Sequence, residues 1–151
     1  MYITVKVSEE VYVKFLGTVD DEGNPYKGRI IYSDGISAEV KLEENRIEYS
    51  NGDVYEGEWD NNKRCGKGKL TYNEASNINF YDGEWVDDKK NGFGTMEFKD
   101  GEIYEGEWLN NNRHGKGKDI YANGAVYEGE WADDTFNGYG IKKYKNGDVY
   151  E

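Results

Sequence analysis

The chain has 151 residues and a formal net charge of −12; 36% of its residues are hydrophobic and 33% are charged. An acidic surface repels phosphate backbones and anionic headgroups, which argues against nucleic acid and membrane lipid as partners. Aliphatic residues are scarce, whereas 14 Tyr, 5 Phe and 4 Trp supply most of the large apolar surface. This composition favours a thin architecture covered by aromatic side chains, and it argues against disorder, because disordered chains are poor in aromatics.

The N-terminal stretch "MYITVKVSEEVYVKF" alternates polar and apolar residues, which predicts strands from Ile3 to Val7 and from Val11 to Phe15. It lacks the apolar region of a signal peptide. The single cysteine, Cys65, cannot form an internal disulfide, and no apolar run is long enough to span a bilayer. These features predict a soluble, cytoplasmic protein.

A repeat frame begins weakly in the N-terminal third. "FLGTV" at Phe15 lies 23 residues before "AEVKL" at Ala38, and a tight turn is expected near Glu44-Asn45. We interpret residues 1–14 as N-terminal capping strands, which protect the edge of a repeat sheet. Residues 15–54 are interpreted as two degenerate repeats.

The frame is clear from Tyr55 onwards. Four tryptophans, spaced 26, 23 and 23 residues apart, each end a Tyr-acid-Gly-Glu-Trp pattern: Trp59, Trp85, Trp108 and Trp131. Six residues follow, interpreted as a loop, and then Gly-x-Gly; an aromatic residue comes four positions after the second glycine. Residues 55–151 are therefore four clear repeats plus the first strand of a fifth, continuous with the preceding units in a single repeat domain.

Within each unit, aromatic residues and glycines alternate with acids, which indicates strands and not helices. Hairpin turns are predicted at Asp34-Gly35, Asn51-Gly52, Asp100-Gly101, Asn123-Gly124 and Asn146-Gly147. Three extra residues between Tyr72 and Tyr81 predict a longer, protruding loop. The prediction is an all-β, elongated, single-layer antiparallel sheet of consecutive β-hairpins.

Charge suggests the register of these hairpins. A three-residue loop at Asn123-Gly124 is expected to place Tyr121 opposite Tyr127 and Gly117 opposite Trp131. The corresponding expectations elsewhere are Lys118 opposite Glu130, Phe98 opposite Tyr104, Gly94 opposite Trp108 and Tyr150 opposite Tyr144. In this register Tyr, Trp and Gly share one face, and Glu and Lys share the other.

The pattern Tyr-x-Gly-x-Trp, six residues, Gly-x-Gly, at a period of 23, resembles the MORN repeat (membrane occupation and recognition nexus). The resemblance implies an elongated, twisted sheet of hairpins with aromatics along a groove-like face. It also implies a non-catalytic module that binds or organises other proteins. Such modules occur in cytoskeletal or ciliary assemblies, or beside an enzymatic domain such as a lipid kinase or SET methyltransferase.

We therefore predict a scaffold module that binds a partner peptide or helix along an aromatic groove, within a larger assembly. The groove residues are expected to be Tyr55, Trp59, Tyr72, Tyr81, Trp85, Phe98, Tyr104, Trp108, Tyr121, Tyr127, Trp131 and Tyr144. An acidic rim is expected to steer a basic or amphipathic protein segment. Its residues are Glu56, Glu58, Glu84, Glu105, Glu107, Glu128 and Glu130.

No catalytic residue, metal site or cofactor is predicted. His114 precedes Gly-x-Gly at a position where the other units have Cys65, Asn91 and Asn137, and one catalytic role cannot be shared by His, Cys and Asn. The paired acids of each strand resemble a glycosidase pair, but every unit repeats them. The Asp pairs in the loops lack the ligand spacing of a calcium site, and no phosphate loop is present.

A second reading stays open at this point. Short hairpin repeats rich in Tyr, Trp and Gly also occur in carbohydrate- or cell-wall-binding proteins, whose aromatic side chains stack on sugars. The Gly-x-Gly motif and the absence of a signal peptide favour the protein-binding reading.

Overall fold

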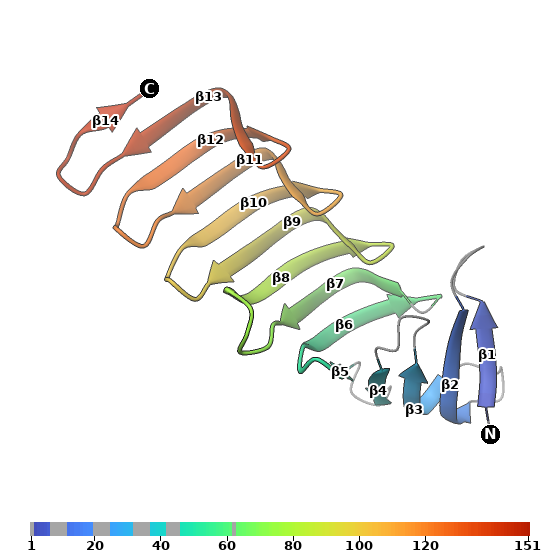
Figure 1. Ribbon diagram of the computed structural model, residues 1–151. Helices are drawn as coiled ribbons and strands as arrows, with labels where there is room; N and C mark the ends of the chain where they lie inside the picture. Colours follow the sequence, from blue (N-terminus) through green and yellow to red (C-terminus); the bar gives the residue numbers. More distant parts are fainter. Residues whose placement is uncertain (1, 7–11, 20–24, 32–36, 42–45, 62) are drawn as a thin grey trace.

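A computed structural model of the chain describes residues 2–6, 12–19, 25–31, 37–41, 46–61 and 63–151, with side chains described for 46–61 and 63–151. Every regular element in these residues is a β-strand, and sequence neighbours are neighbours in one sheet. Figure 1 shows a ladder of hairpins with no second layer over the part of the chain that is described. The predicted all-β fold is confirmed, and this part of the chain has no helix that could cross a membrane.

The strands are β1 (Tyr2–Lys6), β2 (Tyr12–Val19), β3 (Pro25–Ile31), β4 (Ser37–Lys41), β5 (Arg46–Tyr49), β6 (Val54–Asp60), β7 (Lys63–Thr71), β8 (Ile78–Val86), β9 (Lys89–Phe98), β10 (Ile103–Leu109), β11 (Asn112–Ile120), β12 (Val126–Ala132), β13 (Thr135–Lys143) and β14 (Val149–Tyr150). β1 and β2 are the predicted N-terminal pair, with Ile3 opposite Phe15. Four expectations lie outside the described residues: Val7, Val11, the Asp34-Gly35 turn and the turn near Glu44-Asn45. The division into 1–14, 15–54 and 55–151 stays a prediction.

Four connections in the described residues are three-residue loops at one edge of the ladder. In loop 122–124, the Tyr121 N–H donates to the Ala125 carbonyl at 2.9 Å and the Gly124 N–H donates to the Tyr121 carbonyl at 2.8 Å. Gly124 has a φ of 84°, which glycine adopts without steric cost. The same arrangement closes loops 50–52, 99–101 and 145–147, which confirms the four predicted Asn-Gly and Asp-Gly turns that lie in the described residues.

At the opposite end, the connections between β8 and β9, β10 and β11, and β12 and β13 are two-residue turns, so the expected six-residue loop is wrong in these units. Asp87 and Asp88 have φ values of 49° and 65°, as in a type I′ turn, and Val86 pairs with Lys89 across them. Asp and Asn tolerate this left-handed conformation better than most residues. The flanking residues therefore remain in the strands, and only two of the six residues form the turn.

The Gly-x-Gly motif lies in a β-bulge that bends each hairpin. Between the pairs Gly106↔Gly117 and Trp108↔Arg113 the register shifts, leaving one residue of β10 opposite three of β11. That single residue is Glu107, whose carboxylate accepts a hydrogen bond from the Lys116 backbone N–H at 3.1 Å. A bulge of this kind bends the strand that carries it, and the two halves of the hairpin fold towards the aromatic side chains.

The predicted strand register is wrong by two residues. Tyr127 lies opposite Asp119, not Tyr121, and Trp131 lies opposite Gly115. The other observed pairs are Lys118↔Glu128, Tyr104↔Met96, Trp108↔Gly92 and Tyr150↔Lys142. The physical reason is that the three-residue loop is 122–124, closed by Tyr121 and Ala125, whereas the expected register requires a loop one residue later in the chain; moving a loop by one residue shifts every strand pair by two. Because the shift is an even number of residues, the predicted division into two faces still holds.

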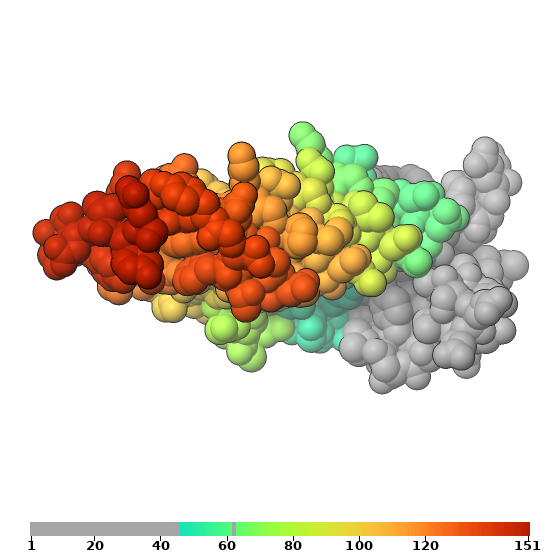
Figure 2. Space-filling model, turned by 90° about the horizontal axis from the view of Figure 1, so that it is seen from above, coloured from blue at the N-terminus to red at the C-terminus, as the bar shows by residue number. Residues whose placement is uncertain are grey.

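The longer connection between β7 and β8 is confirmed. Residues 72–77 lie outside the strands, and Figure 2 shows this segment as a light-green projection from the elongated body. The Lys99 ammonium donates to the carbonyl oxygens of Asn73 and Glu74 at 3.1 and 2.8 Å. The insertion is thereby tied to the neighbouring hairpin.

The core is a stack of tyrosines and tryptophans on one face of the bent sheet. Tyr104 lies over the cross-strand pair Gly106 and Gly117, where a Cβ on Gly117 would come 2.3 Å from the tyrosine hydroxyl oxygen. Trp108 packs edge-on between Tyr104 and Tyr81, with ring centroids 5.1 and 5.3 Å apart. The same stacking joins Tyr55 to Trp85 and Tyr104 to Trp131, so aromatic contacts link each unit to the next.

Candidate functional site

Most of the predicted groove residues are buried core residues. The seven with 6% or less of their surface exposed are Tyr55, Tyr81, Trp85, Tyr104, Trp108, Tyr127 and Trp131. Trp59, Tyr72, Phe98 and Tyr121 are partly buried, and Tyr144 is 45% exposed. The buried members hold the sheet together and offer little area to a partner, because the bent hairpins close over them.

Four aromatic residues form what we call the aromatic row: Tyr72, Phe98, Tyr121 and Tyr144. Each lies where β7, β9, β11 or β13 meets the connection to the next strand. The row belongs to the same face as the buried core, two residues beyond the Leu70 and Met96 positions. Adjacent strands are about 4.8 Å apart, so members on every second strand recur about every 9.5 Å along the sheet.

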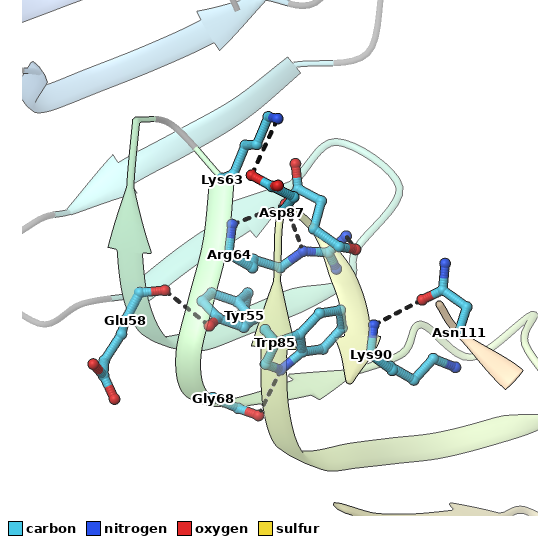
Figure 3. A network of polar contacts seen from close by, with 10 residues as sticks. Tyr55, Glu58, Lys63, Arg64, Gly68, Trp85, Asp87, Lys90 and Asn111 are labelled. Atoms are coloured by element: carbon cyan, nitrogen blue, oxygen red, sulfur yellow. Dashed lines mark hydrogen bonds and ion pairs between the residues drawn. The ribbon is translucent and has the colours of Figure 1, made fainter. Parts of the chain in front are cut away.

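A cationic side chain covers each inter-unit tryptophan on this aromatic face. The Arg64 guanidinium carbon lies 4.3 Å from the ring centroid of Trp85, and the Arg64 Nε lies 3.0 Å from the Asp88 carboxylate (Figure 3). The corresponding distances are 4.9 Å for Lys90 over Trp108 and 4.4 Å for Arg113 over Trp131. These contacts are cation–π interactions that close the core from above.

The two-residue turns between strands, such as Asp87-Asp88, also connect each unit to the preceding one. The Asp88 carboxylate also accepts the Arg64 backbone N–H at 2.9 Å, and the Asp88 N–H donates to the Arg64 carbonyl at 3.1 Å. Asn111 makes the same pair of contacts with Lys90, without a carboxylate to neutralise the ammonium. Burial lowers the pKa of Lys90 from 10.5 to about 8.

The predicted acidic rim lies on the opposite face, which we call the polar face. Acids alternate with aromatics along each strand, and alternate residues point to opposite faces. Glu58, Glu107 and Glu130 accept a backbone N–H within the bulge of their own hairpin at 2.9 to 3.1 Å. Those three acids are structural. The others of the predicted set are exposed: Glu56, Glu84, Glu105 and Glu128.

The polar face has a hollow that the sequence analysis missed. Phe93 and Tyr139, the middle residues of two Gly-x-Gly motifs, are 57% and 63% exposed at its two sides. Lys116, Lys118 and Glu128 lie between them, in a depression of about 470 Å³. The sequence signal that could have revealed this hollow is the aromatic residue in the middle of these two Gly-x-Gly motifs, where the other two units have lysine.

A second missed feature is a buried carboxylate in the third unit. Asp119 is 1% exposed and occupies the position of Leu70 and Met96 in the preceding units. Its Oδ2 accepts a hydrogen bond from the Arg113 guanidinium at 3.1 Å. Burial, together with the nearby Glu102 carboxylate, raises the pKa of Asp119 from 3.8 to about 6. Comparison of the four units by position would have revealed this departure.

The remaining reactive side chains do not assemble into a site in the part of the chain that is described. Cys65 and His114 occupy equivalent bulges two units apart, and burial raises the pKa of the Cys65 thiol. No group of three His, Cys, Asp or Glu side chains there could hold a metal ion.

These features define a β-hairpin repeat protein in which aromatic stacking joins the units. The MORN repeat pattern matches residues 55–74, 81–103, 104–126 and 127–149, which is more than half of the chain. The chain therefore belongs to the MORN-repeat family.

A comparison with curated protein sequences gives no match. Among solved structures, the chain is similar to the SAS-4 (dCPAP) TCP domain of Drosophila melanogaster, determined in complex with a proline-rich motif of Ana2 (dSTIL). The TM-score is 0.50 and the sequence identity is 18%, over 89% of this chain and 75% of that domain. The likeness is one of fold.

Proposed function

We propose that the chain is a non-catalytic interaction module that binds an extended, proline-rich segment of a partner protein along the aromatic row. The observation behind this proposal is that Tyr72, Phe98, Tyr121 and Tyr144 keep exposed surface, while the tyrosines and tryptophans of the Tyr-x-Gly-x-Trp patterns are buried except for Trp59, which is partly buried. A row of partly open aromatic side chains on a rigid sheet is the surface that proline-rich peptides use.

The spacing of the row supports this occupant. A polyproline II helix rises about 3.1 Å per residue with three residues per turn, so one side recurs about every 9.3 Å. The row recurs about every 9.5 Å. A segment lying along the sheet can therefore place a proline against each aromatic ring, and the tyrosine hydroxyls can donate to its free carbonyl groups.

Charge supports basic residues in the partner. The net charge of −12 attracts a basic segment at long range. The complex of the similar SAS-4 TCP domain with a proline-rich motif supports the same class of partner. The His, Cys, Asn series before Gly-x-Gly supports a role without catalysis.

A pair of matched variants tests this function. The probe is a synthetic peptide with proline at every third residue and arginine between, titrated by calorimetry. Phe98→Ala is expected to weaken binding about tenfold, a loss of about 1.4 kcal/mol. Phe93→Ala removes the same side chain from the polar face and is expected to leave the affinity unchanged.

Thermal melts of both variants show whether Phe98→Ala remains folded, because Phe98 packs against the core. Equal affinity of the two folded variants would contradict the proposal. So would a glucan oligomer that binds in place of the peptide and is lost in Phe98→Ala, since that result assigns the row to carbohydrate.

A further inference from the structure

We propose that the cavity beside Asp119 is a binding site for the guanidinium group of a partner's arginine side chain. The site lies between the third and fourth units, next to Tyr121 of the aromatic row. It rests on the proposed function only in that the partner supplies the arginine.

The position of Asp119 is the first observation. Leu70 and Met96 fill the core at this point in the two preceding units, and each is at most 5% exposed. A buried carboxylate in the same place costs folding free energy unless it is paired and fully hydrogen-bonded. The fold alone accepts an aliphatic side chain here, so the carboxylate calls for another explanation.

The cavity is the second observation. Its volume is about 320 Å³, and it is lined by Glu102, Arg113, Asp119, Tyr121, Trp131, Asp134, Thr135 and Phe136. Three carboxylates therefore face one guanidinium. The Arg113 side chain reaches all three, at 3.1 Å from Asp119, 3.3 Å from Asp134 and 3.9 Å from Glu102. With Lys142, which also faces Asp119, three acids stand against two cations, and a further cation would neutralise the remaining negative charge.

Unsatisfied polar atoms are the third observation. Asp119 Oδ1 is buried and has no hydrogen-bond partner in the described residues. The indole N–H groups of Trp59 and Trp131 are also buried without a partner among them, whereas the Trp85 and Trp108 indoles donate to glycine carbonyls at 2.9 and 3.1 Å. Buried polar atoms are normally paired, so a buried carboxylate oxygen without a donor, in a residue beside a cavity, indicates a missing donor that reaches it when the cavity wall adjusts.

The chemistry of the walls selects guanidinium. A planar guanidinium donates in parallel to carboxylates and stacks on aromatic rings. Asp119 and Glu102 supply the acceptors, and Tyr121 and Phe136 supply the rings. The Lys142 ammonium lies 4.4 Å from the Tyr121 ring centroid, so an incoming guanidinium takes the place of this ammonium, whereas Arg113 keeps its place over Trp131. Arg113 shows the same recognition within the chain, since its guanidinium lies over Trp131 and contacts Asp119.

Binding is expected to depend on pH. The charged groups that face Asp119 are Glu102 at the start of β10, Arg113 on β11, Lys142 on β13 and Asp134 in the β12–β13 turn. Burial raises the pKa of Asp119 to about 6. The carboxylate is therefore ionised near pH 7.5 and protonated near pH 5, where the attraction for a cation is reduced.

The test uses n-butylguanidinium as the probe, with the neutral isostere n-butylurea as the control, and follows the Trp131 indole resonance by NMR. Saturable binding of the cation near pH 7.5 is expected, with affinity up to about tenfold lower near pH 5. Asp119→Leu, which restores the residue type of Leu70, is expected to abolish binding. Asp119→Asn, of nearly the same shape, is expected to weaken it about tenfold and provides a second variant should the first misfold.

Three results would overturn the site: no saturable shift in the native chain, equal binding of the urea, or unchanged affinity in both Asp119 variants. The small probe needs no partner, so the two proposals fail separately. Butylguanidinium binding without proline-peptide binding rejects the aromatic row and keeps the cavity. Binding of the proline peptide without binding of butylguanidinium rejects the cavity and keeps the aromatic row.

Discussion

At the scale of single residues, the repeat is built on tyrosine lying over paired glycines. The Tyr104 hydroxyl donates to the Glu107 carbonyl at 3.1 Å, and the ring fills the space above Gly106 and Gly117. Alternation in the sequence predicted that these residues share a face. The nearly complete burial of Tyr104 could not be predicted, because it depends on the bulge at Gly115, and the two extra residues of β11 at this bulge are not visible in the pattern of a single strand.

Gly117→Ala is expected to lower the free energy of unfolding by about 3 kcal/mol, because the new Cβ meets the Tyr104 ring. Gly101→Ala is the control. That residue has a φ of 94° with nothing within 4 Å of its Cβ position, so the cost is backbone strain of about 1 kcal/mol. Urea denaturation compares the two. A smaller loss for Gly117→Ala than for Gly101→Ala would contradict this packing.

Asp119→Leu is expected to raise the free energy of unfolding near pH 7.5 by about 1 to 3 kcal/mol, since a buried charge is replaced by an apolar side chain while Arg113 keeps its ion pair with Asp134 at 3.3 Å. The folded pKa of Asp119 lies above its ordinary value, so the folded chain binds the proton more tightly than the unfolded chain. Relative to the variant, the native chain should gain stability as the pH falls from 7.5 through about 6. A difference that stays constant down to pH 5 would contradict the raised pKa.

At the scale of the hairpin, two kinds of turn set the repeat. Three-residue loops close one end, and type I′ turns at the other end clamp each unit to the one before. The Asn-Gly signal predicted the first kind correctly. The type I′ turn was predicted as part of a longer loop, because Asp and Asn in a polar stretch indicate loops of any length. A two-residue turn is recognised only from the strand pairing on both sides of it, as between Val86 and Lys89.

A double-mutant cycle at the second clamp tests its contribution. Lys90→Arg with Asn111→Asp recreates the Arg64–Asp88 pair, which is 3.0 Å apart. The increase in the free energy of unfolding of the double variant is expected to be larger than the sum of the two single-variant changes by about 0.5 to 1 kcal/mol. Thermal and urea unfolding at low salt measure this coupling. Additive single effects would show that the ion pair does not stabilise the junction.

At the scale of the whole molecule, the open sheet has the two faces that the alternation of residues predicted, and the acids therefore do not border the aromatic row. The aromatic row lies on one face, and the exposed acids such as Glu105 and Glu128 lie on the other. The family and the fold class could be predicted, because a 23-residue repeat fixes both. The sequence could not predict which aromatic side chains stay exposed. The burial of Tyr104 and the exposure of Tyr144 depend on how neighbouring hairpins bend over each other.

The most direct measurement of the central claim is the affinity of proline peptides as a function of spacing. Two peptides of equal length and composition carry proline at every third or every fourth residue. The first is expected to bind about tenfold more tightly, and Phe98→Ala is expected to remove the difference while Phe93→Ala keeps it. Equal affinity of both peptides for the native chain would contradict binding of a polyproline II segment along the aromatic row.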